Sequence, residues 1–168
     1  MIREAVPATD AARIAQIYGH YVAHDTATFE IEPVSADEMW ARIEGVQERG
    51  LPWTVVELGG EIVGYAYAAP FRDRIAYRHT LEATVYLDAG VRRGGLGTAI
   101  YSDLLDRLRG LEGSVHAPVR SVMAVIALPH EGSVALHERL GFRHVGTVVD
   151  AGFKLDRWID VGYWQLAL

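Results

Sequence analysis

The sequence VRRGGLGTAIYSDLLDRL, from Val91 to Leu108, places three glycines and two arginines directly before an amphipathic helical pattern. A tight turn requires one or two glycines, so three of them indicate a loop whose backbone approaches a ligand closely. The helix that follows offers its free N–H groups and the positive end of its dipole to that loop. The pattern therefore predicts an anion site, and a phosphate group is the expected anion.

Two common phosphate-binding motifs do not fit this loop. A Rossmann fingerprint requires a third glycine at position 100, where the chain has Ile100, and a parallel βα unit near the amino terminus. A Walker loop requires a lysine after its last glycine, and none follows Gly97. The spacing that remains is Arg92, two residues, Gly95, one residue, Gly97. On the residues alone, an ordinary glycine-rich turn with solvated arginines is an equal alternative.

Periodicity before the loop predicts one short strand, two helices and three consecutive strands. The first helix follows a strand at residues 2–5 and has Thr9 or Asp10 as its expected cap. The second begins with a capping-box pattern, Ser35 with Glu38. The strands are WTVVEL and EIVGYAYAAPF, joined across a glycine pair as a hairpin, and HTLEATVYLD.

After the loop and its helix, the pattern predicts one buried strand, a short helix and a final pair of strands. SVMAVIAL is apolar on both faces, as expected for a central strand, and GSVALHERLGF is a helix with Gly141 as its stop. FRHVGTVVDAGF and RWIDVGYWQLAL are the last two strands. The order β-α-α-β-β-β-α-β-α-β-β predicts an α/β (α+β) fold with a mixed central sheet of about seven strands and about four helices. No linker or repeat interrupts it, so residues 1–168 are expected to form a single domain.

Composition excludes several classes of protein. The chain has 22 acidic and 16 basic residues, a balance that repels a nucleic-acid backbone. It has no cysteine, which excludes thiolate zinc sites and cysteine nucleophiles, and its seven histidines lack ligand spacing, so no metal is expected. The opening MIREAV is not a basic and apolar leader, and no apolar run is long enough for a membrane span. We therefore expect a cytoplasmic protein without a nucleic-acid or membrane partner.

The loop and the element order resemble the GNAT superfamily of N-acetyltransferases, whose acyl-CoA loop reads Gln/Arg-x-x-Gly-x-Gly/Ala. Moreover, TATFEIEP, FRDRIAYRHTLEATVYL, RRGGLGTAIYSDLL, AVIALPHEGSVALHERLGF and GFKLDRWIDVGYWQL are similar, in order and spacing, to blocks of the phosphinothricin acetyltransferase family. These segments cover most of residues 26–166. The resemblance implies the GNAT fold, a homodimer, and transfer of acetyl from acetyl-CoA to the α-amine of phosphinothricin, methionine sulfoximine or methionine sulfone.

The resemblance also implies which residues contact acetyl-CoA. Val85 and Leu87 are expected to do so through their backbone, with Tyr86 alternating to the other face. A β-bulge in this strand is expected to leave an N–H unpaired for the oxyanion. The complete expected set is Val85, Tyr86, Leu87, Arg92, Arg93, Gly94, Gly95, Leu96, Gly97, Thr98, His130 and Ser133. Two positions depart from the family: His130 stands where asparagine is usual, and Gly94 replaces a bulkier residue.

Two residues are candidates for proton transfer. By resemblance, Glu82 is the general base, acting directly or through a water; the alternative is a strand carboxylate paired with Arg74 or Arg78. His137 stands where many GNAT enzymes carry a tyrosine that protonates the thiolate of coenzyme A. An imidazole titrates near neutrality, so it can donate that proton or share in deprotonating the substrate. The alternative for His137 is a capping or packing role within a short helix.

The acceptor is expected to bind a cluster of basic and aromatic residues. Guanidinium groups of Arg72 and Arg74 match carboxylates in bidentate fashion, and Tyr77 lies beside them in the sequence. Phe29 is expected to wall the pocket by resemblance. Lys154 and Trp158 belong to a segment that, in the family, contributes to the pocket or the dimer contact. The alternative is that the arginines are surface charges.

Two other functions remain open on the sequence. The same chemistry can serve a polyamine, an antibiotic or a protein amino terminus, although a polycation calls for an acidic cleft rather than an arginine cluster. The chain can also be an acyl-CoA-binding sensor without turnover, which requires the glycine loop but no base. Because there is no cysteine to carry an acyl group, a catalytic chain is expected to transfer acetyl directly in a ternary complex.

Overall fold

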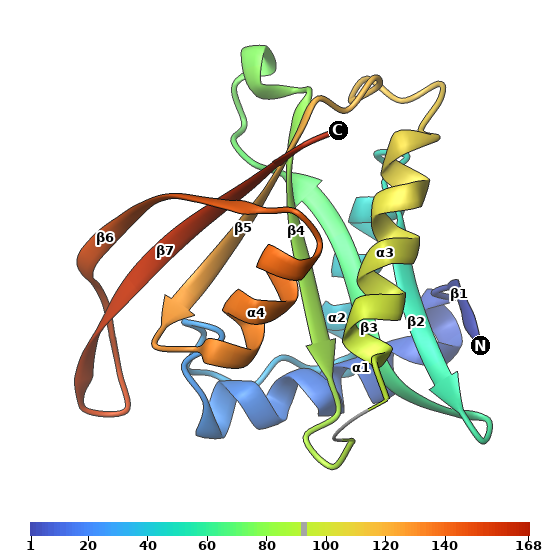
Figure 1. Cartoon of the computed structure of the whole chain (residues 1–168). Coiled ribbons are helices and arrows are strands. Elements are labelled where there is room, and N and C mark those ends of the chain that lie inside the picture. Colours follow the sequence, from blue (N-terminus) through green and yellow to red (C-terminus); the bar gives the residue numbers. More distant parts are fainter. Residues whose placement is uncertain (92–93) are drawn as a thin grey trace.

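The computed structural model describes residues 1–91 and 94–168, so the predicted roles of Arg92 and Arg93 lie outside the described residues. Within these ranges the elements follow the predicted order (Figure 1). They are β1 (Ile2–Glu4), α1 (Pro7–His24), α2 (Ala36–Gln47), β2 (Trp53–Leu58), β3 (Glu61–Pro70), a 3₁₀ turn η1 (Ile75–Tyr77), β4 (Thr80–Leu87), α3 (Leu96–Arg109), β5 (Ser121–Leu128), α4 (Glu131–Arg139), β6 (Arg143–Lys154) and β7 (Arg157–Ala167). None of the described helices combines the length and apolar character needed to cross a membrane.

The seven strands form one mixed sheet in the order β1-β2-β3-β4-β5-β7-β6. The neighbours β4 and β5 are parallel, whereas the other neighbouring pairs are antiparallel. Helices α1 and α2 cover one face of the sheet, and α3 and α4 cover the other (Figure 1). The predicted mixed sheet between helices is thereby confirmed.

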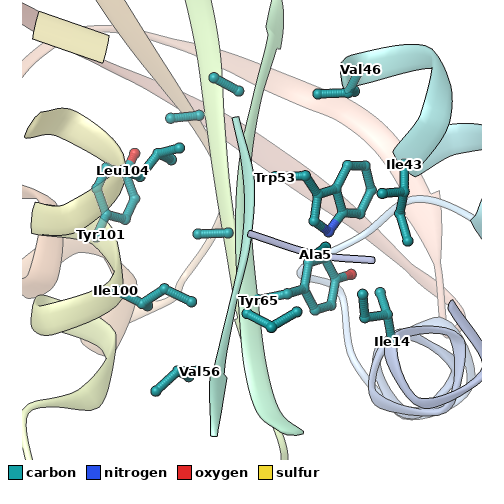
Figure 2. Packing of buried hydrophobic residues seen from close by; sticks show 14 of the residues in the cluster. Ala5, Ile14, Ile43, Val46, Trp53, Val56, Tyr65, Ile100, Tyr101 and Leu104 are labelled. Carbon is teal, nitrogen blue, oxygen red and sulfur yellow. The ribbon is translucent and has the colours of Figure 1, made fainter. Parts of the chain in front are cut away.

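The core lies on both faces of the central strands. On one face Trp53 and Tyr65 pack with Ile14 and Ile43 of the first two helices, and on the other face α3 contributes Ile100 and its neighbours (Figure 2). These side chains are buried. Burying a large apolar side chain contributes about 1.5–3 kcal/mol. The core therefore fixes β2, β3 and the start of β4, and this anchors the end of β4 at Leu87 relative to the helices.

The start of α1 differs from the prediction. Val6 is the N-cap, without a capping side chain, and Pro7 opens the helix, so Thr9 and Asp10 lie inside its first turn. Proline suits this position because its fixed φ is helical and its missing N–H needs no partner. The Asp10 carboxylate instead accepts the Val6 N–H at 2.8 Å and pairs with Arg3 at 2.6 Å. The expected cap is wrong because Pro7 starts the helix before Thr9 and Asp10 are reached.

Other local predictions are confirmed. Ser35 Oγ accepts a hydrogen bond from the Glu38 N–H at 3.1 Å at the start of α2. The hairpin between β2 and β3 turns through Gly59 and Gly60, with φ values of +59° and +86°, which a two-residue hairpin turn favours. Gly141 has φ of +93° directly after α4. Each of these boundaries is determined by residues that are neighbours in the chain, so the sequence alone predicts them.

Candidate active site

The pairing of the two parallel strands stops before either strand ends. Partners run only from Thr80 with Ser121 to Glu82 with Met123, although β4 and β5 both continue beyond this point. The two strands then diverge (Figure 1). A cavity of about 470 Å³ is lined by the diverging halves of both strands. The gap in the sheet is therefore the candidate active site.

The cavity is lined from both helical layers. One group of lining residues comes from α1, from the segment after it and from the strand faces turned toward them: Tyr18, Tyr21, Thr26, Ala27, Thr28, Phe29, Tyr67, Glu82, Thr84 and Tyr86. A second group comes from the start of α3 and from α4 with its N-cap: Gly97, His130, Gly132, Ser133, Leu136 and His137. Because residues from both faces line one cavity, two ligands can approach from opposite sides of the sheet and meet in the gap.

Backbone donors of β4 face this gap. The carbonyl of Thr80 and the N–H of Asp88 both bond to β3 or its flanking residues, so even-numbered residues of β4 pair on that side. The N–H groups of Val85 and Leu87 therefore point away from β3, where β5 has already diverged. The hydroxyl of Tyr21 donates to the Leu87 carbonyl at 2.6 Å on this open side.

The predicted β-bulge in β4 is not observed. The register between β3 and β4 is continuous from Gly64 with Leu87 to Pro70 with Leu81. Free donors arise instead from the divergence of β4 and β5, which a sequence pattern cannot display. Tyr86 alternates to the other face, where its ring packs against that of Tyr18 at a centroid distance of 5.3 Å.

The N-terminus of α3 has no side-chain cap. Its N-cap, Gly95, has φ of +73°, and Gly94 has φ of +92°. The first helical hydrogen bond is accepted by the Gly95 carbonyl. The N–H groups of Leu96, Gly97 and Thr98 precede it and have no acceptor within the helix. Since Gly97 also lines the cavity, this end of α3 fits an anionic group such as a phosphate.

The start of α4 forms the neighbouring part of the wall. His130 is the N-cap, and its Nδ1 accepts the Ser133 N–H at 3.1 Å. Both residues line the cavity together with Gly132. The His130 side chain, which stands where asparagine is usual in the family, therefore caps α4.

Glu82 is half-buried and lines the cavity at the point where the strands separate. Burial raises the pKa of its carboxyl, and the charge of Arg72 opposes that shift. Within the described part of the chain, the ion pairs do not include one between Glu82 and Arg74 or Arg78. The carboxylate is thus available to a ligand, and its raised pKa makes it a stronger proton acceptor than an ordinary carboxylate.

His137 is buried, with 4% of its surface exposed. Its Nδ1 donates to the Ser133 carbonyl at 2.7 Å, and its Nε2 accepts from the Tyr101 hydroxyl at 3.1 Å. The carbonyl can only accept, so we assign the proton to Nδ1. Burial lowers the pKa of His137, which favours the neutral ring. Both nitrogens are engaged by the protein, as the packing alternative predicts.

The predicted acceptor residues separate into two groups. Phe29 lines the cavity. Arg72, Arg74 and Tyr77 lie on the exposed connection between β3 and β4 and are not among the lining residues. The Arg72 guanidinium lies 4.2 Å from the centroid of the Phe71 ring, and its charge reaches Glu82. The structure therefore brings Arg72 near the base but leaves the cluster outside the cavity wall.

Three lining tyrosines were missed by the sequence analysis: Tyr18, Tyr21 and Tyr67. The first two recur at helical spacing, and the third alternates along a strand, so all three have the pattern of core residues. Their hydroxyls provide the distinguishing signal, because a tyrosine facing the core usually needs a polar partner. Here the Tyr18 hydroxyl contacts Thr28 Oγ1 at 2.6 Å beside the cavity.

Comparisons with known proteins agree with this geometry. A family model described as an acetyltransferase (GNAT) domain matches residues 3–162. The chain is 42% identical over 164 residues to a phosphinothricin N-acetyltransferase of Streptomyces viridochromogenes, covering 96% of this chain and 86% of that protein. It is 33% identical over 159 residues to an L-methionine sulfoximine/L-methionine sulfone acetyltransferase of Salmonella typhimurium, covering 95% and 90%. A crystal structure of a phosphinothricin acetyltransferase from Sinorhizobium meliloti in complex with acetyl-CoA superposes with a TM-score of 0.92 at 38% identity, covering 100% and 88%.

Proposed function

Because this chain belongs to the GNAT family and is an acetyl-CoA-dependent N-acetyltransferase, we propose that its acceptor is a small amino acid of the phosphinothricin, methionine sulfoximine or methionine sulfone type. The observation that carries the proposal is the cavity through the split sheet, which admits one substrate from each face. The names of the similar enzymes support the choice of acceptor.

Acetyl-CoA is assigned to the α3 and α4 side of the gap. Its diphosphate fits the uncapped N–H groups at the start of α3, and Arg92 and Arg93 are the proposed flanking cations. The backbone of Val85 and Leu87 would hold the arm that leads to the thioester. The coenzyme supplies an acetyl group activated as a thioester. An N–H of β4 that faces the gap would stabilise negative charge on the acyl oxygen.

The acceptor is assigned to the α1 side, against Phe29. Glu82 accepts a proton from the substrate ammonium, directly or through a water, and so frees the amine for attack. Arg72 and Arg74 bind the substrate carboxylate, since their connection leads directly into β4 and Glu82. Tyr77 would flank this group. Two exposed arginines in the connection that leads to Glu82 disfavour a polycationic acceptor.

A proton must also reach the departing thiolate. His137 lies in the cavity wall beside the proposed thioester position, but both of its nitrogens are hydrogen-bonded. Direct donation by His137 therefore requires its bond to Tyr101 to open. We favour the attacking amine as the proton source, with His137 holding α4 against α3. The prediction that His137 is itself the acid stays a prediction.

The homodimer is proposed on the exposed face of the last two strands. Six large apolar side chains on or beside β6 and β7 are about half exposed or more: Val145, Val148, Val149, Phe153, Leu155 and Trp158. Exposed apolar side chains in this number on one pair of strands favour a contact site with another protein surface. A second copy of the chain is the proposed partner.

The deciding experiment measures release of coenzyme A from acetyl-CoA with a panel of acceptors. Phosphinothricin, methionine sulfoximine and methionine sulfone are expected to support turnover. Their N-acetylated forms serve as matched controls and should not react, whereas spermidine and an aminoglycoside test the polycationic alternative. Binding of acetyl-CoA without turnover of any amine would overturn the proposal in favour of the sensor.

A further inference from the structure

The wall of the cavity on the acceptor side is a segment without helix or strand. Residues 25–30 connect α1 toward α2, and four of them, Thr26, Ala27, Thr28 and Phe29, line the cavity. Such a segment has no ladder of backbone hydrogen bonds, so its polar groups must find partners elsewhere. The partners that it finds determine the shape of the wall.

One of these partners is Lys154, the only lysine in the chain. It ends β6 and is buried, with 4% of its surface exposed. Its ammonium donates to the Thr28 carbonyl at 2.8 Å and to the Tyr21 carbonyl, in the last turn of α1, at 3.0 Å. The negative end of the α1 dipole favours a cation at this position. One side chain therefore joins β6, the end of α1 and the cavity wall.

A second contact links the wall to the same strand. The ring of Phe29 lies directly over the backbone of Gly152, where a Cβ atom would overlap the ring. Gly152 and Lys154 are two residues apart on β6, so both contacts come from one stretch of strand. This stretch of β6 therefore contacts the wall at the Thr28 carbonyl and at the Phe29 ring.

The other contacts of the wall do not replace Lys154. The Tyr86 hydroxyl donates to the Ala27 carbonyl at 3.1 Å, and the Tyr18 hydroxyl contacts the Thr28 side chain. Arg157 also donates to the Thr26 hydroxyl at 3.5 Å. None of these contacts reaches the Thr28 carbonyl. Lys154 is also absent from the described residues that line the cavity, so it does not touch a substrate there. Any effect of Lys154 on the reaction must act through the wall.

We propose that Lys154 is a positioning residue for acceptor recognition: its ammonium holds the Thr28 carbonyl and thereby sets the distance of Phe29 from the acceptor beside Glu82. The inference rests on the proposed function, which assigns the acceptor to this side of the gap. The acetyl-CoA side is formed by α3 and α4, whereas the hydrogen bonds of the Lys154 ammonium in the described residues go to the Tyr21 and Thr28 carbonyls. Loss of the ammonium should therefore affect the two substrates differently.

The first test is Lys154→Met, which keeps an unbranched side chain, one heavy atom shorter than that of lysine, and removes the N–H donors. The KM for the amino acid acceptor is expected to rise about tenfold or more. The dissociation constant for acetyl-CoA is expected to stay within about twofold of the wild-type value, which is well below the change in KM. Arg143→Met is the matched control, because Arg143 is an exposed cation on β6, and it should change neither constant.

Chemical rescue separates positioning from general stability. The chain has no cysteine, so Lys154→Cys can be alkylated at one site after unfolding and then refolded. Alkylation with 2-bromoethylamine restores an ammonium at nearly the lysine length, whereas bromoethane adds an uncharged chain. The first product is expected to recover the wild-type acceptor KM and the second is not. If Lys154→Met does not fold, this pair of products carries the test.

Two results overturn the inference. One is an acceptor KM that is unchanged in Lys154→Met while acetyl-CoA binding is intact. The other is equal recovery by the charged and uncharged products. A wild-type enzyme that turns over no amino acid acceptor would instead overturn the proposed function, and the positioning role with it. The two failures are distinguished by whether the wild type is active.

Discussion

Replacing Gly95 or Gly97 by alanine tests the acyl-CoA loop at two positions separated by one residue. Gly95 has φ of +73°, whereas Gly97 lies in the first turn of α3. A Cβ atom at Gly95 would meet no atom within 4 Å. At Gly97 it would lie 3.6 Å from methyl groups of Leu136 and Leu87, an ordinary van der Waals contact. Since neither alanine meets a clash, the backbone conformation decides both outcomes.

The two substitutions are expected to have opposite signs. Alanine in the left-handed region costs about 1–2 kcal/mol because Cβ approaches the following carbonyl. Alanine in place of a helical glycine contributes about 0.5–1 kcal/mol because it loses less conformational entropy on folding. The two variants should therefore differ by about 1.5–3 kcal/mol in free energy of unfolding, with Gly95→Ala below wild type and Gly97→Ala above it.

Urea denaturation followed by circular dichroism measures the stabilities, and titration calorimetry measures acetyl-CoA binding. If Gly95→Ala relieves its strain by rotating the loop, a cost of 1–2 kcal/mol appears in binding as a factor of about 5–30. Gly97→Ala should bind normally, because its Cβ leaves the backbone N–H in place. A Gly95→Ala variant with wild-type stability and wild-type acetyl-CoA affinity would refute the reasoning.

Three further predictions follow from the site. Glu82→Gln should lower turnover at least tenfold and should remove the acidic limb of the pH profile of kcat/KM. In the wild type this limb is expected above pH 4.5, the ordinary pKa of the carboxyl group, because burial raises the pKa of Glu82. Since the raised pKa means that ionised Glu82 costs stability as pH rises through the folded-state value, Glu82→Gln should also unfold at higher urea than wild type at pH 7 but not at pH 4. The amide of His137→Gln can still donate to the Ser133 carbonyl and accept from Tyr101, so this variant should retain kcat within about tenfold, whereas loss of a true proton donor costs about 10²–10⁴-fold. Because burial lowers the pKa of His137, the free energy of unfolding of the wild type should fall more steeply than that of the variant below about pH 6.5. Trp158→Asp should convert the proposed dimer to a monomer in multi-angle light scattering, and a wild-type monomer would contradict the proposal.

Local features were predictable because their causes lie close together in the chain. The Ser35 cap, the glycine pair in the β2–β3 hairpin and the Gly141 stop were all identified from a few neighbouring residues. The start of α1 was not, because Pro7 and the polar pair Thr9 and Asp10 are competing start signals within four residues, and the proline decides. The error is therefore one of weighing competing local signals.

The candidate site was predictable only in part. The sequence predicts Glu82 as the base, and the structure places it in the cavity wall where β4 and β5 separate; its role as base stays a prediction. The cavity-facing tyrosines and the buried partner of Thr28 were not identified in their roles. Their spacing is that of core residues, and the sequence does not display which buried hydroxyl or ammonium lies beside a cavity.

The sequence by itself determined the order of the elements and the glycine-rich helix start, because periodicity, caps and left-handed glycines are short-range properties of the chain. Only the tertiary structure decided where β4 and β5 separate after Glu82 and Met123, which N–H groups this leaves free, and which wall Lys154 holds. Lys154 and Thr28 are 126 residues apart in the chain, and β5 meets β4 only after α3 has crossed the sheet. Contacts over such distances depend on the packing of the whole core, so no local pattern encodes them.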